Sequence, residues 1–189
     1  MNPNLASAPA VHEWQGGDFS CVSASRLNLR LNCPLPEHET PLAAETALET
    51  SLIDPTTGED LGLPLVGVID LVLDVDPGPL IVDFKTSARS AEPLEIAHEI
   101  QLSCYAYLFR HCSMQREDVV EIRTLVKTKL AKIEAYCYPA RSAAHFGRLF
   151  SAIRAYLDDL DSRRFVFRPG FGCAMCDFRE THCRAWAGT

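Results

Sequence analysis

The chain has 189 residues and a mass of 20.9 kDa, which is enough for one domain of ordinary size with a hydrophobic core. Apolar residues make up 47% and charged residues 23%, a composition that excludes a disordered chain. No apolar run approaches the ~20 residues of a membrane span, and the first residues lack the basic and then apolar layout of a secretion signal. We therefore expect a cytoplasmic protein with no membrane partner.

Charge is divided unevenly along the chain. Residues 1–100 contain 4 Lys or Arg and 16 Asp or Glu, a net charge of −12, whereas residues 101–189 contain 14 and 9, a net charge of +5. The overall net charge of −7 taken alone argues against nucleic acid as a partner. The division instead leaves room for a cation site in the acidic half and an anion-binding surface in the basic half.

The elements are predicted from apolar periodicity and from turn residues. Residues 1–20 lack periodicity and are expected to form a flexible arm, and residues 34–44 contain three prolines and are expected to be a connector. The predicted strands are 46–53, 64–74, 79–86, 119–127 and 131–138, and the predicted helices are 23–32, 91–112 and 142–163. This order predicts one α+β domain over 21–189, with a central mixed sheet flanked by helices.

The strands 64–74 and 79–86 are joined by Asp-Pro-Gly-Pro, a strong turn signal, and both are apolar on both faces, as in strands buried between layers. If the turn is centred on the Pro-Gly step, Asp70 lies opposite Lys85 and Val72 lies opposite Asp83. Opposed residues share a face and side chains alternate along a strand. Asp70, Asp83 and Lys85 are therefore expected to point to the same side.

Three charged groups would then converge in apolar surroundings. Buried carboxylates are costly unless they are paired or hold a metal. Two carboxylates beside one ammonium make a good Mg²⁺ site, and the lysine can orient a water or stabilise charge on a phosphate. The alternative is a plain ion pair between Lys85 and either aspartate at a sheet edge.

The motifs GVID (Gly67–Asp70), DFK (Asp83–Lys85) and QLSCY (Gln101–Tyr105) together resemble the PD-(D/E)XK nuclease superfamily. Within it, the chain is most similar to the RecB-like exonucleases, which include the CRISPR-associated adaptation nucleases and the nuclease domain of AddB. The resemblance implies an α/β/α restriction-endonuclease-like core.

The resemblance also implies roles for the motif residues. Asp70, Asp83 and the carbonyl of Phe84 would bind Mg²⁺ or Mn²⁺, and Lys85 would assist the attacking water. Gln101 and Tyr105, four residues apart, would lie on one helix face near the metal and the DNA, although the pair alone also fits an ordinary helix stripe.

The family normally supplies one more active-site His or Glu from a helix before the first strand. Here only about a dozen residues follow Cys33 before that strand, and the candidates are Glu37, His38, Glu39 and Glu45, with His38 and Glu45 as possible metal ligands. The short stretch leaves open a degenerate nuclease that binds DNA without cutting it.

Three of the eight cysteines lie in the cysteine-rich segment 165–189, with Cys173 and Cys176 at chelating spacing and Cys183 as a third ligand. The stretch SASRLNLRLNCP resembles the segment before the nuclease core in RecB-like enzymes that carry an iron–sulfur cluster. The resemblance implies that Cys33 is the fourth ligand and that the two ends of the chain are joined at a [4Fe–4S] cluster. Structural Zn²⁺ is the alternative.

These features predict a metal-dependent DNA exonuclease that hydrolyses phosphodiester bonds in single strands or at duplex ends, in DNA repair, recombination or CRISPR- or phage-related processing. Phosphate contacts are expected from Lys127, Lys129 and Lys132, and a helicase or another DNA-processing subunit is a candidate partner. The alternatives are a non-catalytic DNA-binding or subunit-interaction module and a zinc-stabilised protein with no nucleic-acid role.

Overall fold

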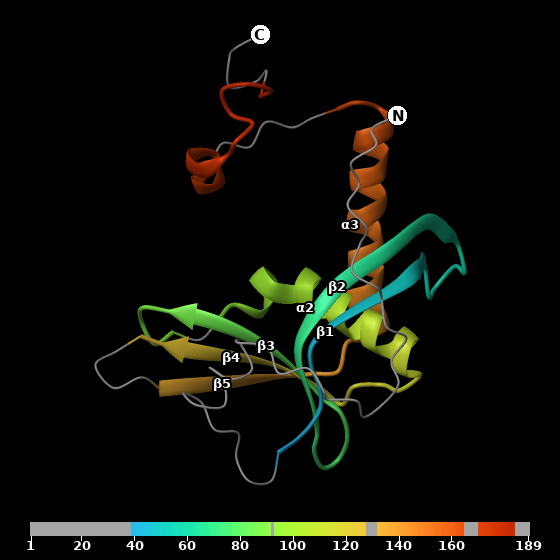
Figure 1. Cartoon of the computed structure of the whole chain (residues 1–189). Coiled ribbons are helices and arrows are strands. Elements are labelled where there is room, and N and C mark those ends of the chain that lie inside the picture. The colour runs from blue at the N-terminus through green and yellow to red at the C-terminus, as the bar shows by residue number, and fades with distance from the viewer. Residues whose placement is uncertain (1–38, 92, 128–131, 165–169, 184–189) are drawn as a thin grey trace. The chain divides into compact units, whose positions relative to one another are not determined.

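The computed structural model describes residues 39–91, 93–127, 132–164 and 170–183 (Figure 1). The chain divides into two compact units, Met1–Phe150 and Ser151–Thr189, and each is described by itself. The predicted arm, the predicted helix 23–32 and the candidate residues Cys33, Glu37, His38 and Lys129 lie outside the described residues.

A five-stranded sheet in the order β1-β2-β3-β4-β5 forms the centre of the first unit. Strands β3 and β4 are parallel, and the other neighbours are antiparallel. The sheet is mixed and is flanked by helices, which confirms the predicted α+β class. The elements are β1 (Thr40–Ile53), β2 (Asp60–Asp74), β3 (Leu80–Ser87), α2 (Glu95–Ser113), β4 (Val119–Val126), β5 (Lys132–Pro139), α3 (Ala143–Asp161) and the 3₁₀ turn η1 (Phe171–Met175).

Helix α2 is the crossover that parallel strands β3 and β4 require. Its buried side chains, among them Leu102, Ala106 and Leu108, pack against the sheet. The Tyr107 hydroxyl donates to carbonyls of β1 at 2.9 Å, and its ring makes edge contacts with Phe146 at the start of α3. These contacts fix α2 across one face of the sheet and bring its motif residues to the end of β3.

The β1–β2 hairpin extends well beyond its neighbour. Strand β3 pairs only with Leu71–Leu73 of β2, and Figure 1 shows the rest of the hairpin leaving the sheet as a twisted ribbon. Gly67 lies against α2, where an added Cβ would stand 2.7 Å from Cδ1 of Leu108. The opposite side of the ribbon is open, and Val66 and Val68 are 59% and 49% exposed. The expectation that the whole strand 64–74 is buried on both faces was therefore wrong for residues 64–68.

Two further predictions need correction. Residues 40–44 belong to β1 rather than to a connector, because β1 is an edge strand and there tolerates Pro41. Val72 pairs with Ile81, not with Asp83, because the turn is centred one residue earlier, on the Asp76–Pro77 step. The register thus differs by two residues, and a shift of two leaves each side chain on its expected face.

The other face of the sheet carries its own apolar cluster. Leu71, Leu73, Leu80 and Val82 are buried there, and Phe84 packs against them. In the described part of the chain, no helix is long and apolar enough to cross a membrane.

Candidate active site

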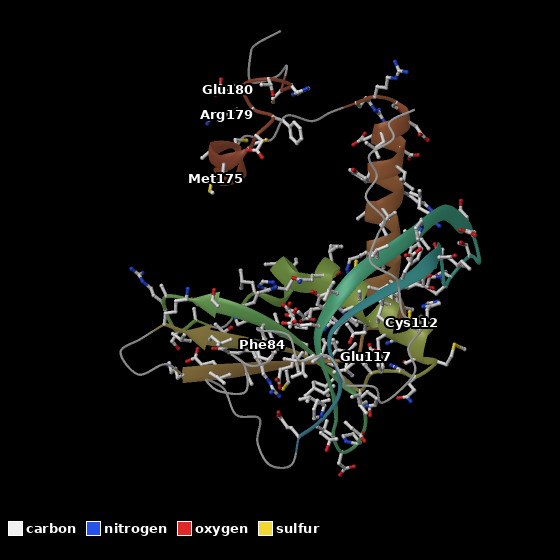
Figure 2. The ribbon with its side chains drawn as sticks, viewed as in Figure 1. Phe84, Cys112, Glu117, Met175, Arg179 and Glu180 are labelled. Atoms are coloured by element: carbon white, nitrogen blue, oxygen red, sulfur yellow. The ribbon has the colours of Figure 1, made fainter. Side chains whose placement is uncertain are left out.

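Asp70 stands where β2 separates from β3. Its Oδ2 accepts a hydrogen bond of 2.8 Å from the backbone N–H of Phe84, which faces the space that β2 has left. Phe84 is labelled in Figure 2 in the middle of the sheet. Because the N–H and C=O of one strand residue point to the same edge, the Phe84 carbonyl faces that space too. The divergence of two strands therefore gathers a carboxylate and a main-chain carbonyl at one point.

Asp83 is the buried charge of the site. It is 1% exposed, and burial raises the pKa of its carboxyl group although Lys85 lowers it through a hydrogen bond and its charge. The charge of Asp70 raises the pKa of Asp83 further, and His98 lowers it. The two aspartates therefore lie close enough to repel each other, as carboxylates at a shared cation site do.

A hydrogen-bond chain links these groups to α2. Nζ of Lys85 donates to Oδ1 of Asp83 at 3.0 Å and to Oε1 of Gln101 at 2.8 Å. Nε2 of Gln101 donates to Oδ1 of Asp83 at 3.2 Å and to the Tyr105 hydroxyl at 2.9 Å. Burial raises the pKa of Tyr105, so its hydroxyl stays protonated. The amide of Gln101 thus holds Lys85 with its oxygen, and its nitrogen donates to Asp83 and Tyr105.

One oxygen in the site has no hydrogen bond. Oδ2 of Asp83 lies 2.7 Å from Nζ of Lys85 but accepts no hydrogen bond from the part of the chain that the structure describes. Carboxylate and carbonyl oxygens are the donors that Mg²⁺ and Mn²⁺ prefer. Asp83, Asp70 and the Phe84 carbonyl therefore fit a divalent cation in the type of their donor atoms.

A second cluster of two carboxylates and one cation lies on the opposite face. Arg123 pairs with Phe84 in the β3–β4 ladder, one position out of step with Asp83 and Lys85, and so points the other way. Its guanidinium donates to both oxygens of Glu39 at 2.9 and 2.7 Å and also to Glu121. Glu39, a candidate for the additional active-site acid, is therefore engaged away from Asp70 and Asp83.

The sequence profile of the PD-(D/E)XK nuclease superfamily matches residues 35–184 of this chain. The chain belongs to this superfamily. No curated protein matches the chain.

Two solved structures resemble this PD-(D/E)XK protein at low identity. The crystal structure of SSO0001 is 16% identical with a TM-score of 0.45, over 75% of this chain and 59% of that one. A structure from Eubacterium rectale named "Putative exonuclease" is 13% identical with a TM-score of 0.45, over 74% of this chain and 52% of that one. The chain thus spans less than two thirds of either.

Within the described residues, no third side-chain ligand joins Asp70 and Asp83 in this PD-(D/E)XK site. Among the described residues, no group of three or more His, Cys, Asp or Glu side chains is placed to hold a metal ion. The pairs Ala44–Leu71 and Thr46–Ile69 set Glu45 opposite Asp70 across the hairpin. Glu45 is exposed and has a φ of 47°, a left-handed conformation that non-glycine residues adopt mostly under functional or turn constraints. Of the candidates within the described residues, Glu45 has the position closest to Asp70 in the ladder.

Sequence reasoning missed His98. It lies on α2 three residues before Gln101 and seven before Tyr105, so all three share one helix face, and its charge acts on Asp83. Extending the Gln–Tyr spacing one turn toward the N-terminus of the helix would have found it.

The lysines expected to contact phosphate differ in their surroundings. Lys127 is exposed, and its N–H donates to the Ser87 carbonyl at 2.8 Å, which places it beside the end of β3. Nζ of Lys132 lies 2.6 Å from Glu134, and this contact, with help from Ser90, lowers the pKa of Glu134 to about 2. Lys132 is therefore already paired with a carboxylate.

The cysteine-rich segment belongs to the second unit. Cys173 and Cys183 are half-buried and Cys176 is exposed, and the N–H of Cys173 bonds the Gly170 carbonyl at 2.9 Å to form η1. Figure 2 shows Met175, Arg179 and Glu180 on these turns. The three thiols are not gathered into a metal site within the described residues, and Cys33 lies outside them.

Proposed function

We propose that this PD-(D/E)XK protein is a divalent-metal-dependent DNA exonuclease that hydrolyses phosphodiester bonds. The observation that carries the proposal is Asp83, a carboxylate that is 1% exposed, has one oxygen without a hydrogen bond, and is flanked by Asp70 and Lys85. A buried ionised group with spare lone pairs is stabilised by a cation. The superfamily match supports the nuclease activity and DNA as the substrate.

In this proposal Asp70, Asp83 and the Phe84 carbonyl hold Mg²⁺ or Mn²⁺, and Glu45 or His38 completes the set. When bound, the metal neutralises charge on the phosphate and lowers the pKa of a coordinated water. Lys85 has three N–H donors, of which two are directed at Asp83 and Gln101. Nζ also lies 2.7 Å from Oδ2 of Asp83, and in this proposal the third N–H would turn to the attacking water or a phosphate oxygen once that carboxylate oxygen binds the metal.

Hydrolysis forms a bond between the water oxygen and phosphorus and breaks the bond from phosphorus to the sugar oxygen, which leaves as a hydroxyl. Gln101 keeps the ammonium of Lys85 directed at the reacting phosphate, and Tyr105 keeps the amide of Gln101 in place. Gln101 and Tyr105 are positioning residues in this scheme, because their polar groups are directed at each other and at Lys85. Lys127 is the lysine best placed to contact the phosphate backbone beyond the site.

The test is digestion of end-labelled single-stranded and duplex DNA by the full chain in Mn²⁺. The Asp83→Ala and Lys85→Ala variants should each lose activity on the order of 10²–10³-fold. Glu121→Gln, a change on the opposite face, is the matched control and should keep wild-type activity. Resistance of circular DNA together with digestion of linear DNA would support an exonuclease. Equal digestion by wild type and both alanine variants would reject the assignment.

A second candidate is a degenerate nuclease that binds DNA, or a partner subunit such as a helicase, without cutting. The engagement of Glu39 by Arg123 favours it, because this removes one acid from the candidates for the additional ligand. It predicts salt-dependent DNA binding with no turnover in any divalent metal. Either form fits a role in DNA repair, recombination or CRISPR- or phage-related processing.

We also propose that Cys33, Cys173, Cys176 and Cys183 bind a [4Fe–4S] cluster, with structural Zn²⁺ as the alternative. Support comes from the spacing of the three tail cysteines and from the resemblance of the stretch around Cys33. Anaerobically purified protein should be brown and contain four iron and four sulfide per chain, and Cys176→Ser should lose both. A colourless protein with one zinc per chain would reject the cluster in favour of zinc.

A further inference from the structure

We propose that His98 is the general acid of the site, a catalytic residue that protonates the sugar oxygen as this oxygen leaves the phosphate. The inference rests on the proposed nuclease function, and it gives a residue to a step for which the scheme above names none. Hydrolysis releases the sugar oxygen as a hydroxyl, so a proton must reach this oxygen as its bond to phosphorus breaks.

His98 shares a helix face with the two motif residues of α2. It lies three residues before Gln101 and seven before Tyr105, and side chains at this spacing are neighbours on one face. That face is turned toward the site, because the Gln101 amide is hydrogen-bonded to Asp83 and Lys85. Three residues of a helix rise by about 4.5 Å, so His98 stands one turn beyond Gln101.

The electrostatics of Asp83 agree with this placement. Burial raises the pKa of the Asp83 carboxyl group, and the charge of His98 is among the influences that lower it. The imidazole is therefore near enough to act on the buried carboxylate. It is not placed as a metal ligand, because the described residues contain no group of three or more His, Cys, Asp or Glu side chains that could hold a metal ion.

His98 also differs from the other histidines that the structure describes. His111, His145 and His182 each hold Nδ1 at 2.8, 2.8 and 2.7 Å from an oxygen no more than four residues away, so their rings have local structural partners. In the described part of the chain, His98 has no hydrogen bond or ion pair. It is half-buried, so its ring nitrogens are left for a bound substrate.

The direction of α2 sets the side of the site on which His98 lies. The helix runs back along the parallel pair β3 and β4, so its first turns lie toward the end of β3. Lys127 lies at that end, with its N–H bonded to the Ser87 carbonyl at 2.8 Å. In an in-line displacement the attacking and leaving oxygens flank phosphorus on opposite sides. Lys85 then serves the water, and His98 serves the leaving oxygen, whose nucleotide extends toward Lys127.

Protonated His98 supplies one proton to the reaction and then recovers it. The water oxygen forms a bond to phosphorus and loses a proton to solvent, and the electron pair of the breaking bond moves to the sugar oxygen. That oxygen takes the N–H proton of the imidazolium, and the neutral imidazole regains a proton from solvent. Imidazole suits this exchange because it gains and loses a proton near neutral pH.

The experiment compares DNA whose cleavage needs a general acid with DNA whose cleavage does not. Sulfur in place of a bridging oxygen leaves as a thiolate, which is stable without a proton because thiols have a pKa of about 8.5. The full chain is assayed in Mn²⁺ on normal single strands and on strands with sulfur at either bridging position. Affinity for Mn²⁺ is measured separately by calorimetry.

Two variants separate proton transfer from charge. His98→Gln keeps a hydrogen-bond donor, and His98→Arg keeps a positive charge whose proton cannot be released. The matched control is His111→Gln, a change at an exposed residue of the same helix whose ring bonds a main-chain carbonyl.

Both His98 variants should cleave normal DNA about 10²-fold more slowly than the wild type, as expected for the loss of a general acid. On the sulfur-bridged strand that the wild type cleaves, both variants should match the wild type. Their affinity for Mn²⁺ should be unchanged, and His111→Gln should resemble the wild type in every assay.

Three results would overturn the role of His98. An equal loss on normal and sulfur-bridged DNA would make it a positioning residue, normal cleavage by His98→Arg would reduce it to a positive charge, and weaker Mn²⁺ binding in both variants would make it a metal ligand. Wild-type rates in both variants would reject the role and leave the nuclease function standing. If the wild type cleaved none of these strands, the nuclease function itself would be rejected, and the role of His98 with it.

Discussion

Two clusters on opposite faces of the same β3–β4 pair have the same composition and different chemistry. Asp70 and Asp83 surround Lys85 on the α2 side, and Glu39 and Glu121 surround Arg123 on the other side. Each cluster has two carboxylates and one cation. Among the residues that the structure describes, the first cluster alone has a buried carboxylate oxygen without a hydrogen bond, Oδ2 of Asp83, which lies 2.7 Å from Nζ of Lys85.

The difference comes from the geometry of the cation. The guanidinium of Arg123 forms a fork that bonds both oxygens of Glu39 and reaches Glu121 as well. Burial lowers the pKa of Arg123, but the hydrogen bonds to both glutamates outweigh burial and raise it. Lys85 is a point charge shared with Gln101, and it leaves the pKa of Asp83 raised by burial. Two acids and a base therefore do not by themselves identify a metal site, because the geometry of the cation decides how many carboxylate lone pairs stay free.

The largest expected effect is a loss of stability when the cluster of Glu39, Glu121 and Arg123 is disrupted. Arg123→Met removes the fork and leaves two nearly buried carboxylates without a cation, which should lower the free energy of unfolding by about 3–5 kcal/mol in urea denaturation. Arg148→Met is the control, because Arg148 pairs with Glu99 while 53% exposed and should cost less than about 1 kcal/mol. Similar losses in both variants would remove the distinction between the clusters.

A divalent metal should stabilise the protein through the cluster of Asp70, Asp83 and Lys85 and not through the cluster around Arg123. Mn²⁺ at about 100 times its Kd should raise the free energy of unfolding of the wild type by about 2.7 kcal/mol. Asp83→Asn should abolish this gain, whereas Glu121→Gln should retain it. Thermal denaturation with Mn²⁺ or with EDTA measures this stabilisation in both variants. If Mn²⁺ did not stabilise Glu121→Gln, the metal would instead be assigned to the face that carries Glu121 and Arg123.

Asp83 should also make the metal-free protein less stable as the pH rises. Burial raises the pKa of Asp83 above its ordinary value of 3.8, so the folded chain holds the proton more tightly than the unfolded chain. The stability from this group is present below pH 3.8 and is lost as the pH rises through the raised pKa. As the pH rises from 3.8 to the raised pKa, the free energy of unfolding of Asp83→Asn should therefore increase relative to that of the wild type, by about 1.4 kcal/mol per unit of pKa difference. Urea denaturation in EDTA from pH 4 to pH 7 tests this, and a constant difference would contradict it.

The smallest effect is expected at the end of the hydrogen-bond chain. Tyr105→Phe removes one acceptor from the Gln101 amide, a loss of about 1 kcal/mol, and should lower kcat roughly fivefold with little change in KM for DNA. Tyr136→Phe removes the hydrogen bond from the Tyr136 hydroxyl to Glu134 on the edge strand β5 and is the control. A change in KM alone for Tyr105→Phe would mean that the hydroxyl contacts DNA instead.

Much of the fold follows from local patterns in the sequence. The five strands follow from apolar runs bounded by turn residues, α3 follows from its apolar periodicity, and the Asp-Pro-Gly-Pro turn joins the strands that pair as β2 and β3. The apolar face expected for α2 was wrong in part, because Ile96 and Ile100 are 79% and 46% exposed. The grouping of Asp70, Asp83 and Lys85 depended only on the two-residue repeat of a strand. It therefore survived the error in register.

Other features depend on contacts between distant residues. Nothing near Glu39 indicates that its partner is Arg123, 84 residues away. The exposure of Val66 and Val68 arises because β3 is shorter than β2, and apolar residues alone do not reveal the length of a neighbouring strand. The role of Gln101 toward Lys85 also needed the packing angle of α2, which spacing does not fix.

The close contact between Gly67 and Leu108 limits which residues can replace Gly67. Leu108 is fully buried, so alanine at position 67 would force either the Leu108 side chain or α2 itself to shift. Gln101 lies on the same helix as Leu108, and Gly67 lies three residues before Asp70 on β2. A methyl group at position 67 would thus shift Gln101 and, through it, a lysine that the methyl group does not touch.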